Sequence, residues 1–159
     1  MSFINDKSSD NYITNKEDWI RIKDYIPKDK KIWCPFYCDG KQKEYFNEMG
    51  FDVIHEDKDF FDYIPEYDIV IDNPPFSKKK EILKRLKELD KPFILVAPSV
   101  LLCYKYFQED FKDHLQIIVP FNRVKFRHVD SINKNYTPPY ATLYFCYKMN
   151  FEKDLIFVD

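Results

Sequence analysis

Short apolar runs alternate along this chain with segments whose apolar residues recur at helical spacing. The most restrictive run is Phe93-Ile94-Leu95-Val96-Ala97, which is continuously apolar, as is typical of a strand buried on both faces of a parallel sheet. The segment before it carries Ile82, Leu83, Leu86 and Leu89 on one helical face. Because a strand of this kind needs helices on both sides, we expect an α/β fold with an open, mostly parallel sheet.

The same alternation extends over most of the chain. Strands are expected at about residues 32–36, 51–54, 67–71, 93–97, 115–119, 124–127 and 142–147. Helices are expected at about residues 15–26, before Gly50, and at about 78–90 and 100–112. Thr14 and Glu17 have the spacing of a capping box at the start of the first helix. A long loop, residues 130–139, separates the last two strands, which is typical of a functional segment.

Composition limits the kind of protein. A chain of 159 residues with 2 Gly is expected to form a single minimal domain, residues 1–159, without a separate target-recognition domain. It contains no window of 18 apolar residues and its first ten residues are polar. We therefore expect no membrane span and no secretory signal, and a cytoplasmic or other intracellular location. The four cysteines are scattered, and no metal site is predicted.

Charge is distributed unevenly between the two halves. Residues 1–76 carry 10 Lys and Arg against 17 Asp and Glu, whereas residues 77–159 carry 15 against 10. The second half is therefore the expected side for a polyanion such as nucleic acid. For the run Lys78-Lys79-Lys80, an ordinary solvated helix face remains an equal alternative.

The most informative motif follows the strand expected at about residues 67–71. There the sequence reads Asp72-Asn73-Pro74-Pro75-Phe76, and two successive prolines end a strand and stiffen the turn that follows. In an open parallel sheet, ligands collect beyond the carboxyl ends of the strands. The alternative is a purely structural Pro-Pro turn, but the position favours a functional one.

Residues 73–76 resemble the catalytic motif of S-adenosylmethionine-dependent amino methyltransferases, particularly those that act on N6 of adenine in nucleic acid. The resemblance covers roughly residues 11–147 and implies a Rossmann-like methyltransferase domain with an antiparallel closing strand. It implies that S-adenosyl-L-methionine is the cofactor. The catalytic residues that it implies are Asn73, Pro74, Pro75 and Phe76.

The resemblance also implies a set of cofactor-binding residues. Residues 33–40 are similar to the first, glycine-rich cofactor loop, although Cys38 replaces its first glycine, and residues 11–14 are similar to a short motif at the methionine end. Acidic residues after the second strand would hold the ribose hydroxyls, and residues 58–61 would contact the adenine. The implied cofactor-binding residues are Tyr12, Thr14, Pro35, Phe36, Tyr37, Cys38, Asp39, Gly40, Glu56, Asp57, Asp59, Phe60 and Asn73.

Residues 122–126 and 138–143 look like the closing hairpin of phage DNA N6-adenine methyltransferases, which favours DNA over RNA. Arg and Lys neutralise phosphate, and an aromatic ring can stack on a base. The implied substrate-binding residues are Phe76, Lys125, Phe126 and Arg127. An exposed edge strand guarded by charges remains an equal alternative for this basic stretch.

The motif also suits the chemistry on physical grounds. The lone pair of an adenine amino group is delocalised into the ring and must be localised before it attacks a methyl group. The Asn73 side-chain carbonyl and the Pro74 backbone carbonyl could accept both amino hydrogens, and the proline rings would keep that geometry rigid. Phe76 would then stack on the target base, which must leave the helix in a duplex.

Two other functions remain open. A non-catalytic methyltransferase-like subunit, binding nucleic acid or a catalytic partner, is favoured by the altered glycine at Cys38. A small-molecule or protein glutamine methyltransferase is the other alternative, and it would not bind nucleic acid in a salt-dependent way. With no recognition domain expected, target selection would depend on residues 127–140, single-strand shape or a second subunit.

Overall fold

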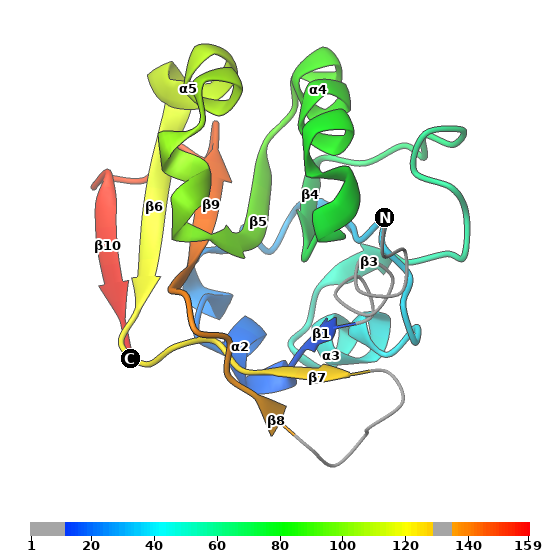
Figure 1. Cartoon of the computed structure of the whole chain (residues 1–159). Coiled ribbons are helices and arrows are strands. Elements are labelled where there is room, and N and C mark those ends of the chain that lie inside the picture. The colour runs from blue at the N-terminus through cyan, green and yellow to red at the C-terminus, as the bar shows by residue number, and fades with distance from the viewer. Residues whose placement is uncertain (1–11, 129–134) are drawn as a thin grey trace.

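The structure of the protein is a computed structural model that describes residues 12–128 and 135–159. Within them, one sheet has seven strands in the order β10-β6-β9-β5-β4-β2-β3, and a small sheet has the order β1-β7-β8. The small sheet lies at the bottom of Figure 1, beyond the ends to which the arrowheads of β6 and β10 point. The chain is therefore built around one large sheet with a small sheet at its carboxyl edge.

The strands are β1 Tyr12–Thr14, β2 Lys31–Trp33, β3 Asp52–Ile54, β4 Ile69–Asp72, β5 Phe93–Pro98, β6 Leu115–Pro120, β7 Phe126–His128, β8 Asn135–Tyr136, β9 Thr142–Tyr147 and β10 Leu155–Val158. The α-helices are α2 Lys16–Ile20, α3 Gln42–Glu48, α4 Lys79–Leu89 and α5 Lys105–Phe111. The 3-10 helices are η1 Lys23–Tyr25, η2 Phe76–Lys78, η3 Ser99–Cys103 and η4 Lys112–His114. No helix in the described ranges is long and apolar enough to cross a membrane.

Most strands of the large sheet run in the same direction. β3, β2, β4 and β5 pair in parallel, and β6 pairs in parallel with β10. β9 lies between β5 and β6 and is antiparallel to both. The structure thus confirms the predicted α/β class and the mostly parallel sheet with an antiparallel closing strand, an arrangement compatible with a Rossmann-like fold.

Successive residues of the central strand β5 enter two different hydrophobic clusters. Ile94 and Val96 pack with Trp19 of α2 and Phe46 of α3. Phe93, Leu95 and Ala97 pack with residues of α4 and α5 on the opposite face. The prediction that residues 93–97 form a strand buried on both faces is confirmed, and the fold has three layers.

The first predicted helix differs most from its prediction. The α-helix ends at Ile20 and a short 3-10 helix follows, so the expected helix over residues 15–26 is interrupted. The capping-box prediction was wrong, because the N-cap is Asn15 and its side chain makes no capping hydrogen bond. Thr14 instead belongs to β1, where it pairs with Phe126 of β7. Strand pairing in the small sheet therefore outweighs the local spacing that assigned Thr14 to the start of the helix.

The closing hairpin predicted over residues 122–126 and 138–143 does not form with those bounds. The later segment leads into β9, which pairs with β5 and β6 in the large sheet, and β7 pairs with β8 in the small sheet. β7 and β8 pair antiparallel, with Phe126 opposite Tyr136, and β1 pairs with the other edge of β7. β8 lies inside the predicted loop over residues 130–139, of which residues 130–134 lie outside the described residues, as does Asn11. Strands β1 and β10 were not predicted.

Candidate functional site

The site lies where the strand order of the large sheet reverses. From β2, the chain passes to β3 on one side, and then to β4 on the other side of β2. The loops that leave the carboxyl ends of β2 and β4 are residues 34–40 and 73–76. Ligands of open α/β sheets bind at such a switch point. The two segments with the strongest predicted functions therefore emerge side by side.

Asp72, the last residue of β4, connects these two loops. Its side chain is 1% exposed and accepts hydrogen bonds from the backbone N–H groups of Phe36 at 2.7 Å and Asn73 at 2.8 Å. The Gln42 side-chain amide of α3 donates a third, at 3.1 Å. Burial raises the pKa of Asp72 to about 7, although these three hydrogen bonds act in the opposite direction. One buried carboxyl group thus holds both loops in place.

The loop after β4 leaves its chemical groups accessible. Residues 73–76 are all partly exposed, and the Asn73 side chain makes no hydrogen bond to any described residue. Phe76 lies outside both core clusters, so it is not an inward-facing core residue. Its ring centroid is 6.1 Å from that of Tyr140, and Lys79 Nζ is 5.6 Å from the Phe76 ring. An amide oxygen and an aromatic ring are therefore both available at this turn.

The loop after β2 forms a turn with two left-handed residues. Cys38 has φ +52° and Gly40 has φ +77°, and the Gly40 N–H donates to the Tyr37 carbonyl at 2.9 Å. The Tyr37 ring stacks on His55 at a centroid distance of 5.0 Å, and His55 Nδ1 lies 2.8 Å from the Cys34 carbonyl oxygen. Cys38 thus adopts a conformation that favours glycine, and the loop forms without its first glycine.

A groove of about 320 Å³ lies between the loops that follow β2, β3 and β4. It is lined by Pro35, Phe36, Tyr37, Cys38, Asp57, Lys58, Asp59, Phe60, Phe61, Asn73, Pro75, Lys78 and Ile82. Its volume falls in the range of about 300–1,000 Å³ that is usual for small-molecule sites. The predicted cofactor residues that it brings together are Pro35, Phe36, Tyr37, Cys38, Asp57, Asp59, Phe60 and Asn73.

Three predicted cofactor residues near the groove, Glu56, Asp39 and Gly40, do not line it. Glu56 accepts a hydrogen bond from the Tyr63 hydroxyl at 2.9 Å and pairs with Lys58 at 2.9 Å, and both contacts lower its pKa. Asp57 makes no such contact with the described residues. Asp57 is therefore better placed than Glu56 to bind hydroxyl groups of a ligand.

Tyr12 and Thr14, predicted for the methionine end, lie on β1 outside the groove lining. Thr14 is 1% exposed, and its Oγ1 has no hydrogen-bond partner among the described residues. Tyr12 makes an edge contact with His128, with ring centroids 5.3 Å apart. These residues therefore belong to the small sheet that covers the carboxyl edge.

Two of the predicted substrate residues occupy structural positions instead. Arg127 is 9% exposed and donates hydrogen bonds to Asn15 and to the Tyr45 hydroxyl, each at 3.1 Å. Its guanidinium also lies 3.7 Å from Asp39, so Arg127 ties β7 to the loop after β2. Phe126 is 7% exposed and belongs to the core. Neither residue can contact nucleic acid as predicted without leaving these partners.

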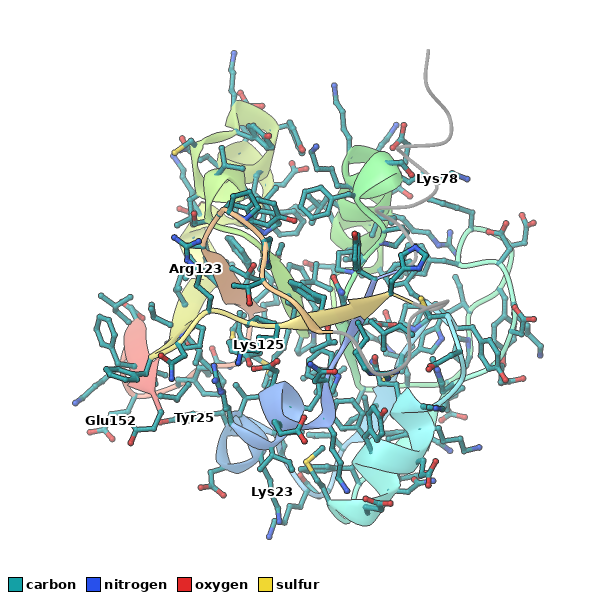
Figure 2. All side chains as sticks on the ribbon, turned by 60° about the horizontal axis from the view of Figure 1, so that its bottom comes forward. Lys23, Tyr25, Lys78, Arg123, Lys125 and Glu152 are labelled. Atoms are coloured by element: carbon teal, nitrogen blue, oxygen red, sulfur yellow. The ribbon has the colours of Figure 1, made fainter. Side chains whose placement is uncertain are left out.

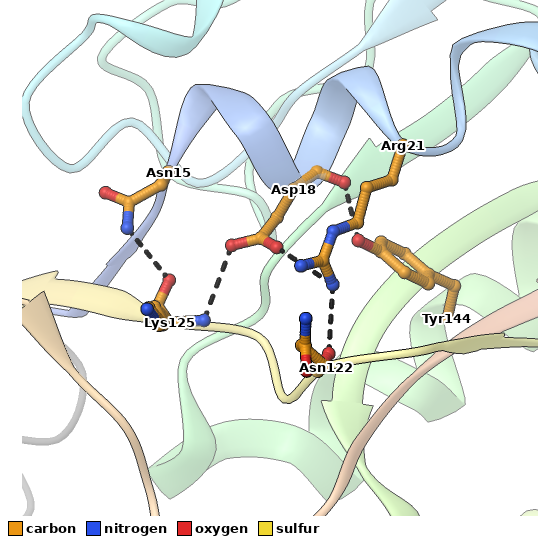
Figure 3. Close-up of polar contacts among 6 residues, drawn as sticks. All are labelled: Asn15, Asp18, Arg21, Asn122, Lys125 and Tyr144. Atoms are coloured by element: carbon orange, nitrogen blue, oxygen red, sulfur yellow. Dashed lines mark hydrogen bonds and ion pairs between the residues drawn. The ribbon is translucent and has the colours of Figure 1, made fainter. Parts of the chain in front are cut away.

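Lys125 remains exposed, because only its backbone is held in place. Its carbonyl accepts from the Asn15 side chain at 3.2 Å, and its N–H donates to Asp18 at 3.4 Å (Figure 3). The Arg21 guanidinium forms an ion pair with the Asp18 carboxylate at 3.4 Å and donates a hydrogen bond to the Asn122 carbonyl at 2.9 Å. Figure 2, turned to bring this edge forward, shows Lys125 near Arg123. The segment before β7 is thus anchored to α2 with its cationic side chain exposed.

Three residues that matter to the site carried little or no signal in the sequence. Asp72 was part of the recognised motif, but its role in joining the loops depends on Phe36, which is far away in sequence. The only signal for this role in the sequence was a carboxylate at the end of an apolar strand, since a buried carboxylate needs hydrogen-bond partners. Gln42 and His55 act through contacts with residues that are distant in the sequence, which no local pattern reveals.

Gly40 offers a test of the loop after β2. A Cβ at this position would lie 2.6 Å from the Tyr37 hydroxyl oxygen, so Gly40→Ala should displace Tyr37 from His55. With S-adenosylmethionine, the cofactor that the sequence resemblance implies, as the calorimetric probe, we expect the affinity of the variant to be about tenfold weaker than that of the unaltered chain, which corresponds to about 1.4 kcal/mol. Gly50→Ala is the control, because Gly50 has φ +91° and open space around it. Equal binding by the two variants would contradict a role for this loop.

No model of a known protein family matches the chain, and no curated protein matches it. Within residues 12–128 and 135–159, no group of three or more His, Cys, Asp or Glu side chains could hold a metal ion. A function for the groove therefore has to be argued from its own geometry.

Proposed function

We propose that this protein is an S-adenosylmethionine-dependent methyltransferase that acts on N6 of adenine in nucleic acid, with DNA preferred over RNA. The observation that carries the proposal is the position of Asp72. Its carboxyl group accepts hydrogen bonds from the backbone of both loops, at Phe36 in the loop that would bind the donor and at Asn73 in the loop that would bind the amine, beside one groove. A methyltransferase needs such a junction, because donor and acceptor must meet in a fixed orientation.

The groove fits a nucleoside-containing donor in its chemistry. Phe36 and Phe60 supply aromatic surface, with ring centroids 5.3 Å apart, and Asp57 supplies a carboxylate for ribose hydroxyls. Aromatic walls with a few polar groups are typical of cofactor sites. When bound, S-adenosylmethionine would supply an electrophilic methyl group on a sulfonium. Residues 35–38, Asp57, Asp59 and Phe60 are those that would hold it.

Asn73 and Pro74 would act on the adenine amino group. The Asn73 side-chain oxygen and the Pro74 carbonyl oxygen can accept the two amino hydrogens and so localise the nitrogen lone pair. The Asn73 amide is not engaged by other described residues, and Asp72 fixes its backbone N–H at 2.8 Å. Because the Asp72 bond and the two proline rings fix the backbone that carries both acceptors, their effect is expected mainly in the transition state.

Phe76 and Tyr140 would supply the aromatic surface for the target base. One ring follows β4 and the other precedes β9, and their centroids are 6.1 Å apart. Lys78 at the groove and Lys125 before β7 are exposed cations that suit the phosphates on either side. Reading nucleic acid through stacking and phosphate contacts needs no separate recognition domain.

The decisive experiment measures binding of S-adenosylmethionine by calorimetry and then methyl transfer to single-stranded DNA, duplex DNA and RNA that contain adenine. We expect binding, followed by transfer to adenine N6 in DNA. Donor binding with transfer to RNA alone would change the substrate class, and transfer to a glutamine peptide alone would replace nucleic acid with protein. Absence of donor binding would refute the enzyme and favour a non-catalytic subunit.

A further inference from the structure

β10 forms an edge of the large sheet. It pairs in parallel with β6 on its inner side, and among the described residues no strand pairs with its outer side. Figure 1 shows it at the margin of the molecule, and β3 occupies the opposite end of the sheet. Natural proteins usually guard such edges with charges, prolines or bulges, because unpaired backbone groups invite another strand.

The hydrogen bonds to β6 show which backbone groups of β10 point outward. Ile117 N–H donates to the Asp154 carbonyl at 2.9 Å, and Phe121 N–H donates to the Val158 carbonyl at 2.7 Å. In a regular strand the direction alternates at each residue. The N–H and C=O groups of Leu155 and Phe157 therefore face the open edge.

The side chains of the same two residues are unusually exposed for their type. Leu155 is 54% exposed and Phe157 is 71% exposed, whereas Ile156 between them is 8% exposed and packs in the core. Phe121, which is bonded to the end of β10, is 78% exposed. Large apolar side chains gathered on one open edge mark a surface that is covered by a partner.

We propose that this edge pairs with β10 of a second copy of the chain, antiparallel, with Ile156 on the two-fold axis. In this register Leu155 of one copy lies opposite Phe157 of the other, and their outward N–H and C=O groups form the hydrogen-bonded type of antiparallel pair. The residues that flank the strand, Lys153 before the bend at residue 154 and Asp159 after Val158, then bring opposite charges to each end of the paired strands.

The backbone direction and the residue order of β10 favour this register over its neighbours. Moving the axis by half a residue would pair outward-facing backbone groups with inward-facing ones, which removes the hydrogen bonds. Moving it to Phe157 restores the bonds but places Leu155 opposite Asp159. A self-complementary edge with one best register suits a symmetric dimer of identical chains. Because the groove lies toward the β3 end of the sheet, both grooves stay open in this dimer.

Sedimentation over a concentration series tests the dimer. We expect the unaltered chain to reach twice its 19.4 kDa mass, and Phe157→Lys to remain a monomer with unchanged circular dichroism. Ile64→Lys is the matched control, since Ile64 is an apolar residue that is 53% exposed in a loop. A monomer at every concentration, or a dimer unaffected by Phe157→Lys, would overturn the proposal.

Disulfide trapping tests the register. With the exposed cysteines Cys38 and Cys103 changed to serine, Leu155→Cys combined with Phe157→Cys should give a covalent dimer on mild oxidation. Cross-strand pairs have Cα atoms about 5.5 Å apart, within disulfide range. Phe157→Cys alone should not cross-link, because its two copies would be about 8 Å apart diagonally. Efficient cross-linking by that single variant would place the axis at Phe157 and refute the register.

Discussion

Replacing Asn73 by alanine is expected to reduce the rate of methyl transfer at least about 100-fold, the usual effect of removing one preorganised transition-state contact. The variant loses the side-chain oxygen that would accept an amino hydrogen of the adenine. Its backbone N–H, which donates to Asp72 at 2.8 Å, is retained. Binding of S-adenosylmethionine should therefore persist, and single-turnover transfer with saturating donor should separate the two effects.

Two further variants isolate the role of the Asn73 oxygen. Asn73→Asp keeps an acceptor at the same place and should retain part of the activity that Asn73→Ala loses. Asn47→Ala removes an exposed amide on α3, away from the groove, and should leave transfer unchanged. Full activity in Asn73→Ala would exclude the proposed mechanism. Equal losses of donor binding and rate would instead show that Asn73 acts on the donor.

The large sheet could be predicted from sequence because its signals are local. Residues 93–97 and 142–147 carry enough continuous apolar character to identify strands whatever their neighbours. β1 and β10 have three and four residues, and they exist because β7 and β6 offer pairing partners. Thr14 shows the competition directly, since its local pattern suits a helix cap and its long-range partner makes it a strand residue.

The same limit applies to the site. The loops around Phe36 and Asn73 could be predicted from motifs, because residue type and order along the chain define them. Arg127 could not, since its charge suggests a phosphate contact and only the fold brings Asp39 and Tyr45 beside it. In a sequence, an arginine that is held in an ion pair looks the same as an arginine that is exposed to solvent. The difference lies in contacts between residues that are distant along the chain.

Asp72 should make the stability of the protein fall as pH rises from about 4 to about 7. Its pKa is raised from 3.8 to about 7 in the folded state, so folding favours the protonated form. A raised carboxyl pKa contributes stability that is complete below about pH 4 and is lost as pH passes the folded value. At about 1.4 kcal/mol for each pKa unit, the loss between pH 4 and pH 8 is on the order of 4 kcal/mol.

Asp72→Asn removes this titration while keeping the shape of the side chain. The substitution also lowers the free energy of unfolding, because an amide group can face the Phe36 N–H, but this loss does not depend on pH. The difference in unfolding free energy, unaltered protein minus variant, should therefore decrease by the same amount from acid to mildly alkaline pH. Urea unfolding of both proteins at each pH measures it, and the subtraction cancels the other titrating groups. A difference that is constant with pH would show that the three N–H donors balance burial, and one that increases as pH rises would show that they outweigh it.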